Sequence, residues 1–117
     1  MNPDYSIQRG ETLSLIVEAL MGDYLTVSGV AAKMKPVPIG RQTVMPGNEV
    51  AVAADLTIAT LPPGTGFLGG WSLSLNSGQT AALAPGLYLI DASFTVSGNT
   101  IIDGPVLLEV KNSAVAA

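Results

Sequence analysis

The chain has 117 residues, enough for one domain with a hydrophobic core of its own, and it contains neither cysteine nor histidine. Disulfides, thiolate metal sites and catalysis by an imidazole base or a thiol nucleophile are therefore excluded, and we expect a protein that is not an enzyme and needs no cofactor. Five basic residues stand against nine acidic ones, and this net charge of −4 argues against binding to nucleic acid.

The proportion of charged residues is low. Only 12% of the residues are charged and 48% are apolar, whereas a free-standing soluble surface commonly has about 25–35% charged residues. Two interpretations remain open: a surface that packs against neighbouring proteins, or a β-sandwich built from small residues. Neither a basic apolar leader nor an apolar run of about 18–20 residues is present, so we expect a soluble protein that does not enter a membrane.

The first segments predict strands. Residues 4–8 alternate as a short strand, which ends at Arg9-Gly10. Residues 11–20 fit two patterns, because their apolar residues recur both at strand spacing and at helical spacing, with Gly22 able to end a helix. The β-branched residues Thr12, Ile16 and Val17 favour a strand, and the helix remains the alternative.

The next segment predicts a turn, strands and a long loop. A turn at 21–23 leads to a strand at 24–27, and residues 30–35 alternate again. Lysines 33 and 35 lie on the wet face of this second strand, which is typical of an edge strand. From 36 to 48 the chain lacks useful periodicity, and we interpret this part as a long loop or docking arm. Its candidate docking residues are Pro36, Pro38, Arg41 and Met45.

The middle of the chain continues with strands. Residues 50–60 predict one strand with a possible bulge, and the prolines and glycines of 61–66 predict a turn. Residues 71–75 alternate most clearly, with three large apolar side chains on one face and serines on the other. Residues 79–84 then cross to the next strand, and one helical turn could provide this crossover.

Residues 85–96 are the organising segment of the chain. One parity is apolar and the other is increasingly polar, which predicts a central strand that another sheet must cover. A turn at 97–99 predicts a hairpin with 100–103, Gly104-Pro105 interrupts it, and residues 106–111 form the final strand. Residues 112–117 are expected to fray. The predicted core residues are Trp71, Leu73, Leu75, Tyr88, Ile90, Phe94 and Val96.

These elements predict an all-β fold. Seven to nine short strands with turn signals between them are typical of an antiparallel β-sandwich, here a single domain over residues 1–117.

Few residues suggest chemistry. No acidic residues form the close pair that general acid–base catalysis or a hard metal ion would need, so no catalytic, cofactor-binding or metal-binding residue is predicted. Asp91 interrupts the central strand, either as a ligand or switch on the sheet face or as an ordinary solvated carboxylate. Trp71 could form a sugar-binding platform with Tyr88, but its apolar parity favours a place in the core.

Several phrases resemble small virion modules of bacteriophages and prophages. The opening from Tyr5 to Thr12, which contains Arg9-Gly10-Glu11, is similar to their arginine–glycine–acid start. Residues 71–75, 79–83 and 85–91 look like their later part, in which a strand and a Thr-Ala-x-Leu crossover precede a Gly-x-Tyr-x-x-Asp strand. Gly104-Pro105-Val106 is similar to their closing Gly-x-Val strand. The resemblance covers most of the chain.

The resemblance implies an immunoglobulin-like sandwich of the kind found in baseplate, tail-fibre and head-associated proteins. The expected function is that of a non-enzymatic structural protein of the virion, assembled in the host cytoplasm, which docks on other virion structural proteins as a symmetric homo-oligomer or in many copies. A docking module of the tail, baseplate or fibre attachment region and a capsid decoration (cement) protein of the head are both consistent with it. A small carbohydrate-binding sandwich is a further alternative.

Overall fold

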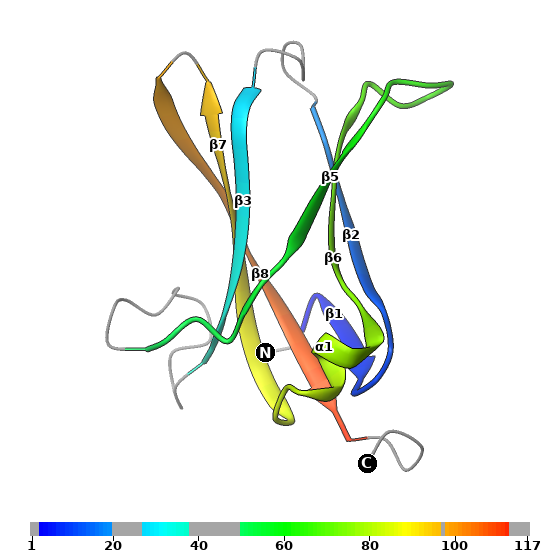
Figure 1. Cartoon of the computed structure of the whole chain (residues 1–117), viewed down its shortest axis with the longest axis vertical. Helices are drawn as coiled ribbons and strands as arrows, with labels where there is room; N and C mark the ends of the chain where they lie inside the picture. Colours follow the sequence, from blue (N-terminus) through cyan, green and yellow to red (C-terminus); the bar gives the residue numbers. More distant parts are fainter. Residues whose placement is uncertain (1–2, 20–26, 38–49, 97, 113–117) are drawn as a thin grey trace.

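Two β-sheets pack face to face in this protein, with one short helix at one end (Figure 1). The computed structural model describes residues 3–19, 27–37, 50–96 and 98–112. Sheet A has five strands and sheet B has three. In spatial order, sheet A consists of β1 (Tyr5–Gln8), β8 (Asn99–Lys111), β7 (Gly86–Val96), β3 (Val27–Pro36) and β4 (Ala54–Asp55), and sheet B of β2 (Leu13–Glu18), β6 (Gly70–Leu75) and β5 (Thr57–Leu61). The expected two-layer β fold is confirmed at this level.

Strand β7 lies at the centre of sheet A, as its sequence predicted. Its inward side chains Tyr88, Ile90 and Phe94 are buried in the core, and Val96 at the end of the strand is half-buried. The outward parity is less polar than expected, because Leu89 is only 1% exposed. Leu89 lies opposite Leu107 of β8, which is buried as well.

Sheet B supplies the other wall of the core. Strand β6 lies in its middle, and its side chains Trp71, Leu73 and Leu75 are all buried. Residues 13–18 form strand β2, so the strand interpretation is confirmed and the helical alternative is wrong. The reason is visible at Ile16, which a helical stripe would bury and which is instead 64% exposed on the outer face.

The expectation of purely antiparallel pairing is wrong at one place. Strand β1 runs parallel to β8, with Tyr5 opposite Leu108. The chain leaves β1 through Arg9 and Gly10 and passes to sheet B instead of returning as a hairpin, so β1 is free to pair in the same direction as β8.

Strand β3 is not the edge that its lysines suggested. It lies between β7 and β4, and Lys33 is opposite Asp55 of β4. Residues 50–60 likewise do not form one bulged strand. Leu56 is 5% exposed, and around it the chain passes from β4 in sheet A to β5 in sheet B. Burying this leucine between the layers requires the change of sheet, which period-two alternation alone does not reveal.

Gly104-Pro105 does not end the last hairpin. Strand β8 continues from Asn99 to Lys111, and the register with β7 shifts between Ile90 and Ala92. One extra residue on β8 is accommodated there as a β-bulge, where a proline without an N–H donor is tolerated.

Some predicted features fall outside the described residues. These include the turn at 21–23, residues 24–26 of the strand expected at 24–27, residues 38–48 of the loop expected at 36–48 with Pro38, Arg41 and Met45, and the tail beyond residue 112. Pro36 is the last residue of β3 and is exposed. The helical turn expected in the crossover is present as helix α1 (Ser77–Ala81). No helix among the described residues is long and apolar enough to cross a membrane.

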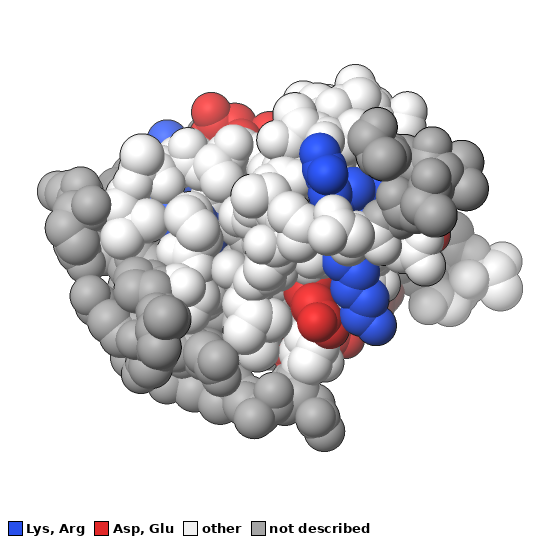
Figure 2. Space-filling model, turned by 90° about the horizontal axis from the view of Figure 1, so that it is seen from below, with Lys and Arg blue, Asp and Glu red and all other residues white. Residues whose placement is uncertain are grey.

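Charged side chains are sparse on the face that Figure 2 presents. Seen from below, a few basic and acidic groups stand among largely uncharged atoms. This distribution agrees with a chain in which only 12% of the residues are charged.

Candidate functional site

Two motifs that lie far apart in the sequence meet beside α1. The Arg9 guanidinium donates from Nη2 to the Ala81 carbonyl oxygen over 2.6 Å, and the Gly10 N–H donates to Thr80 Oγ1 over 3.1 Å. The Thr80 hydroxyl donates to the Glu11 carbonyl oxygen over 2.7 Å. Thr80 is 0% exposed, so its hydroxyl is shielded from water, and the three hydrogen bonds are partly buried. We call this group of five residues the threonine clamp, and its role is structural.

Tyr88 extends this structural end of the molecule. Its hydroxyl donates to the Ala84 carbonyl oxygen over 2.6 Å, four residues earlier in the chain. Burial raises the pKa of the Tyr88 phenol, and the hydrogen bond to Ala84 and the charge of Arg9 only partly oppose that rise. The phenol is therefore neutral at ordinary pH and serves as a hydrogen-bond donor.

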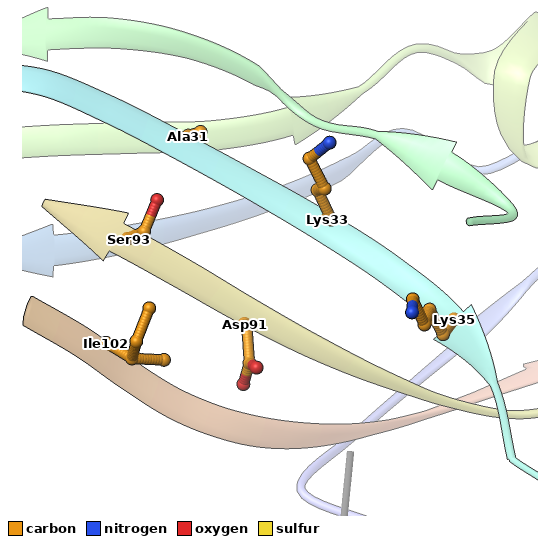
Figure 3. Close-up of a pocket in the computed structure, with 6 residues that line it drawn as sticks. All are labelled: Ala31, Lys33, Lys35, Asp91, Ser93 and Ile102. Atoms are coloured by element: carbon orange, nitrogen blue, oxygen red, sulfur yellow. The ribbon is translucent and has the colours of Figure 1, made fainter. Parts of the chain in front are cut away.

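The outer face of sheet A carries the better candidate for a binding site. A shallow depression of about 250 Å³ lies across β3, β7 and β8 (Figure 3). The strand pairing sets Ala31, Ser93 and Ile102 in one row across the sheet, with Lys33 and Asp91 opposite each other in the next. Alternation along each strand directs all of these side chains outward. The lining residues are Ala31, Lys33, Lys35, Asp91, Ser93 and Ile102.

Charges of both signs follow one another across this face. Lys33 lies between Asp55 of β4 and Asp91 of β7 in the strand register. Its ammonium group is 3.8 Å from Asp55 Oδ1, and both side chains are more than half exposed, so the ion pair adds little to stability. Figure 3 shows the Lys33 ammonium directed away from Asp91. The Lys33–Asp55 pair and the Asp91 carboxylate are therefore separate charged groups on this face.

Asp91 is the acidic residue that the sequence singled out, and it is partly buried in the depression. Its carboxylate points toward β8 (Figure 3). Burial raises the pKa of the Asp91 carboxyl above its usual value. Within the described part of the chain, no three acidic residues gather into a group that could hold a metal ion. Asp91 is thus a single carboxylate in the depression, which it lines together with the apolar side chain of Ile102.

Ile102 is the residue of this site that sequence reasoning missed. It lies beside Ser93 and is 60% exposed, although it is a large apolar side chain in a strand. Its outward direction follows from the bulge in β8, since an extra residue reverses which parity faces the core. The sequence signal was Gly104-Pro105, which marks the bulge but which we interpreted as an interruption.

A second opening lies between the sheets, at the end opposite α1. It has a volume of about 200 Å³ and is lined by residues 27–30 of β3, by Ile58 and Thr60 of β5, and by Trp71. Trp71 is only 6% exposed, and its ring centroid lies 5.0 Å from that of Phe94 at an interplanar angle of 50°. The indole face is thus occupied by protein and offers no open platform for a sugar.

Comparison of the chain with known protein families and with curated proteins finds no match. The depression on sheet A, the threonine clamp and the opening beside Trp71 therefore have to be interpreted from their own geometry.

Proposed function

We propose that this protein is a non-enzymatic structural module of a bacteriophage particle, which docks on other virion proteins through the outer face of sheet A. The observation that carries docking is the exposed Ile102 next to a row of alternating charges. An apolar side chain surrounded by polar and charged groups is the composition of a protein interface. The virion as its location rests on the sequence resemblance.

The finer fold assignment in this proposal is an immunoglobulin-like sandwich. The strand order β1-β8-β7-β3-β4 facing β2-β6-β5 supports it, because it corresponds to the pattern in which strands C, F and G face strands B, E and D. Tyr88 supports it as well, since a tyrosine near the start of strand F that donates to the backbone a few residues upstream is typical of such domains. Trp71 departs from the pattern, because it lies on β6 and not on the strand equivalent to C.

The location is tested by mass spectrometry of purified particles of the phage that carries the gene. We expect the protein in a fixed ratio to the major capsid and tail proteins. Electron cryomicroscopy of the same particles then distinguishes the tail, baseplate or fibre attachment region from a decoration site on the head. Absence of the protein from the particles contradicts the proposal.

The docking face is tested by Ile102→Asp. We expect this variant to keep the thermal stability of the wild type, because the side chain is already 60% exposed, and to be incorporated into particles at a much lower level. Leu68→Asp is the matched control, since Leu68 is 57% exposed outside the depression. Equal loss of incorporation in both variants would reject the outer face of sheet A as the docking site.

The carbohydrate-binding alternative predicts that Trp71→Ala abolishes binding on a glycan array while the fold persists. The contact between Trp71 and Phe94 predicts unfolding or strong destabilisation instead.

A further inference from the structure

The four edge strands of the two sheets differ in how well they are protected. In sheet A, β1 has four residues and β4 has two. In sheet B, β5 has five residues and is followed directly by Pro62 and Pro63. Short edges and prolines are common protections against pairing with another chain. Strand β2 has six residues, Leu13–Glu18, and contains no lysine, arginine, proline or glycine.

The backbone of β2 is prepared to accept a further strand. Among the described residues it pairs on one side only, with β6. The N–H of Ala19 donates to the Gly69 carbonyl oxygen over 2.9 Å, which extends this ladder by one residue. Because the pattern alternates along an antiparallel pair, the N–H and C=O groups of Ser14, Ile16 and Glu18 point away from β6.

The outward side chains of β2 also favour pairing. Ile16 is 64% exposed, and the core holds Leu13 and Leu15 on the opposite parity. The only charge on the strand is Glu18, whose Oε2 already accepts a hydrogen bond from the Leu68 N–H over 2.7 Å. An exposed β-branched residue at the middle of an unprotected edge is well suited to a cross-strand pair.

We propose that a second copy of this chain pairs with β2 in antiparallel fashion, so that Ile16 of one copy lies opposite Ile16 of the other on a twofold axis. Three outward residues in each copy would then exchange about six backbone hydrogen bonds. Sheet B of one copy continues into sheet B of the other. The inference holds whether or not the protein is part of a virion.

A second copy fits this edge because the strand is complementary to itself. In the proposed register Ser14 of each copy lies opposite Glu18 of the other, so no like charges face each other. The two Glu18 residues are about 13 Å apart along the strands, which is beyond the screening length at physiological salt. Ile16 pairs with itself, and opposed β-branched side chains stabilise antiparallel strands.

Glu18 is the only charged side chain in the three outward rows around the joint. The row that contains Ile16 continues through Ser72 of β6 to Ala59 of β5, and the next row contains Ser14, Ser74 and Thr57. No repulsion between these small uncharged side chains opposes the twofold arrangement, which is the commonest symmetry of soluble dimers.

The oligomeric state tests the proposal directly. Sedimentation of the full chain over a range of concentrations is expected to show a monomer–dimer equilibrium, and Ile16→Lys is expected to weaken the dimer by more than about tenfold through like-charge opposition. Tyr5→Lys is the matched control, because Tyr5 is 50% exposed on β1 of the other sheet and does not line the depression, and it should leave the dimer unchanged. A wild-type monomer at every concentration, or an Ile16→Lys dimer of normal strength, overturns the proposal.

The register is tested by engineered disulfides, which the absence of native cysteine makes specific. In the proposed dimer the two Ile16 Cα atoms are about 5.5 Å apart, within reach of a disulfide. The two Ser14 Cα atoms are about 13 Å apart and out of reach. Mild oxidation should therefore link two Ile16→Cys chains and leave Ser14→Cys chains separate. Equal linking of both variants, or of neither, rejects this register.

Discussion

The two ends of the sandwich close the same core by different chemistry. At the α1 end the threonine clamp joins the β1–β2 turn to the helix through partly buried hydrogen bonds. At the opposite end Trp71 packs against Phe94, and beyond this pair the sheets diverge around an opening of about 200 Å³ (Figure 1). Hydrogen bonds therefore hold the β1–β2 turn against α1 at one end, whereas at the other end the Trp71–Phe94 contact leaves a space between the two sheets.

The largest effect is expected at the apolar end. Trp71→Ala removes a buried indole and leaves a cavity against Phe94, so we expect the free energy of unfolding to fall by about 3–5 kcal/mol in a urea titration. Trp71→Phe keeps an aromatic ring there and should cost clearly less. A loss below about 1 kcal/mol for Trp71→Ala would show that Trp71 does not close this end.

The threonine clamp is expected to rank second. Thr80→Val keeps the shape of the side chain but removes the hydroxyl, so the Gly10 N–H loses its acceptor and the Glu11 carbonyl loses a donor. Buried groups left without partners cost about 1–3 kcal/mol, and we expect a loss of stability in this range in the same titration. Thr80→Ser retains the hydroxyl and should lose less. Equal stability of wild type and Thr80→Val would show that the hydrogen bonds of the threonine clamp do not stabilise the α1 end.

Tyr88 makes the α1 end sensitive to alkaline pH. The folded pKa of the phenol is raised above the unfolded value, so folding favours the neutral form. Its contribution is fully present below the unfolded pKa of about 10 and declines as the pH rises through the folded pKa. Tyr88→Phe should cost about 1 kcal/mol at neutral pH and abolish this alkaline decline. Thermal melting curves of both proteins at neutral and alkaline pH measure the difference, and identical profiles would contradict it.

The smallest effect is expected on the open face between the two ends. Burial raises the pKa of the Asp91 carboxyl, so this site favours folding at acidic pH and loses that contribution as the pH rises through the folded pKa. Asp91→Asn should therefore match the wild type in acid and be slightly more stable at neutral pH, within about 0.5 kcal/mol because solvent screens the site. Chemical denaturation at both pH values tests this, and a large loss at neutral pH would identify Asp91 as a structural residue.

Local patterning predicted the strands well where one face is buried and the other is wet. Strand β6 and the inward parity of β7 follow from alternation, because a period of two directs every second side chain to the same side. The threonine clamp was not predicted, since its hydrogen bonds join residues that are 69 to 72 positions apart and neither motif specifies the other. The depression on sheet A was missed for a related reason, because the outward position of Ile102 depends on a bulge in β8.

Composition and alternation alone are enough to predict that this protein is built from β-strands around an apolar interior and contains no imidazole or thiol group. Only the folded arrangement shows which strands are neighbours, which edge strand has a single partner among the described residues, and which exposed residues share a face. The physical reason is that alternation is a property of each strand alone, whereas pairing, register and the passage of the chain from one sheet to the other at Leu56 depend on contacts between distant segments. The parallel pairing of β1 with β8 and the exposure of Ile16 on β2 both depend on such contacts between distant segments.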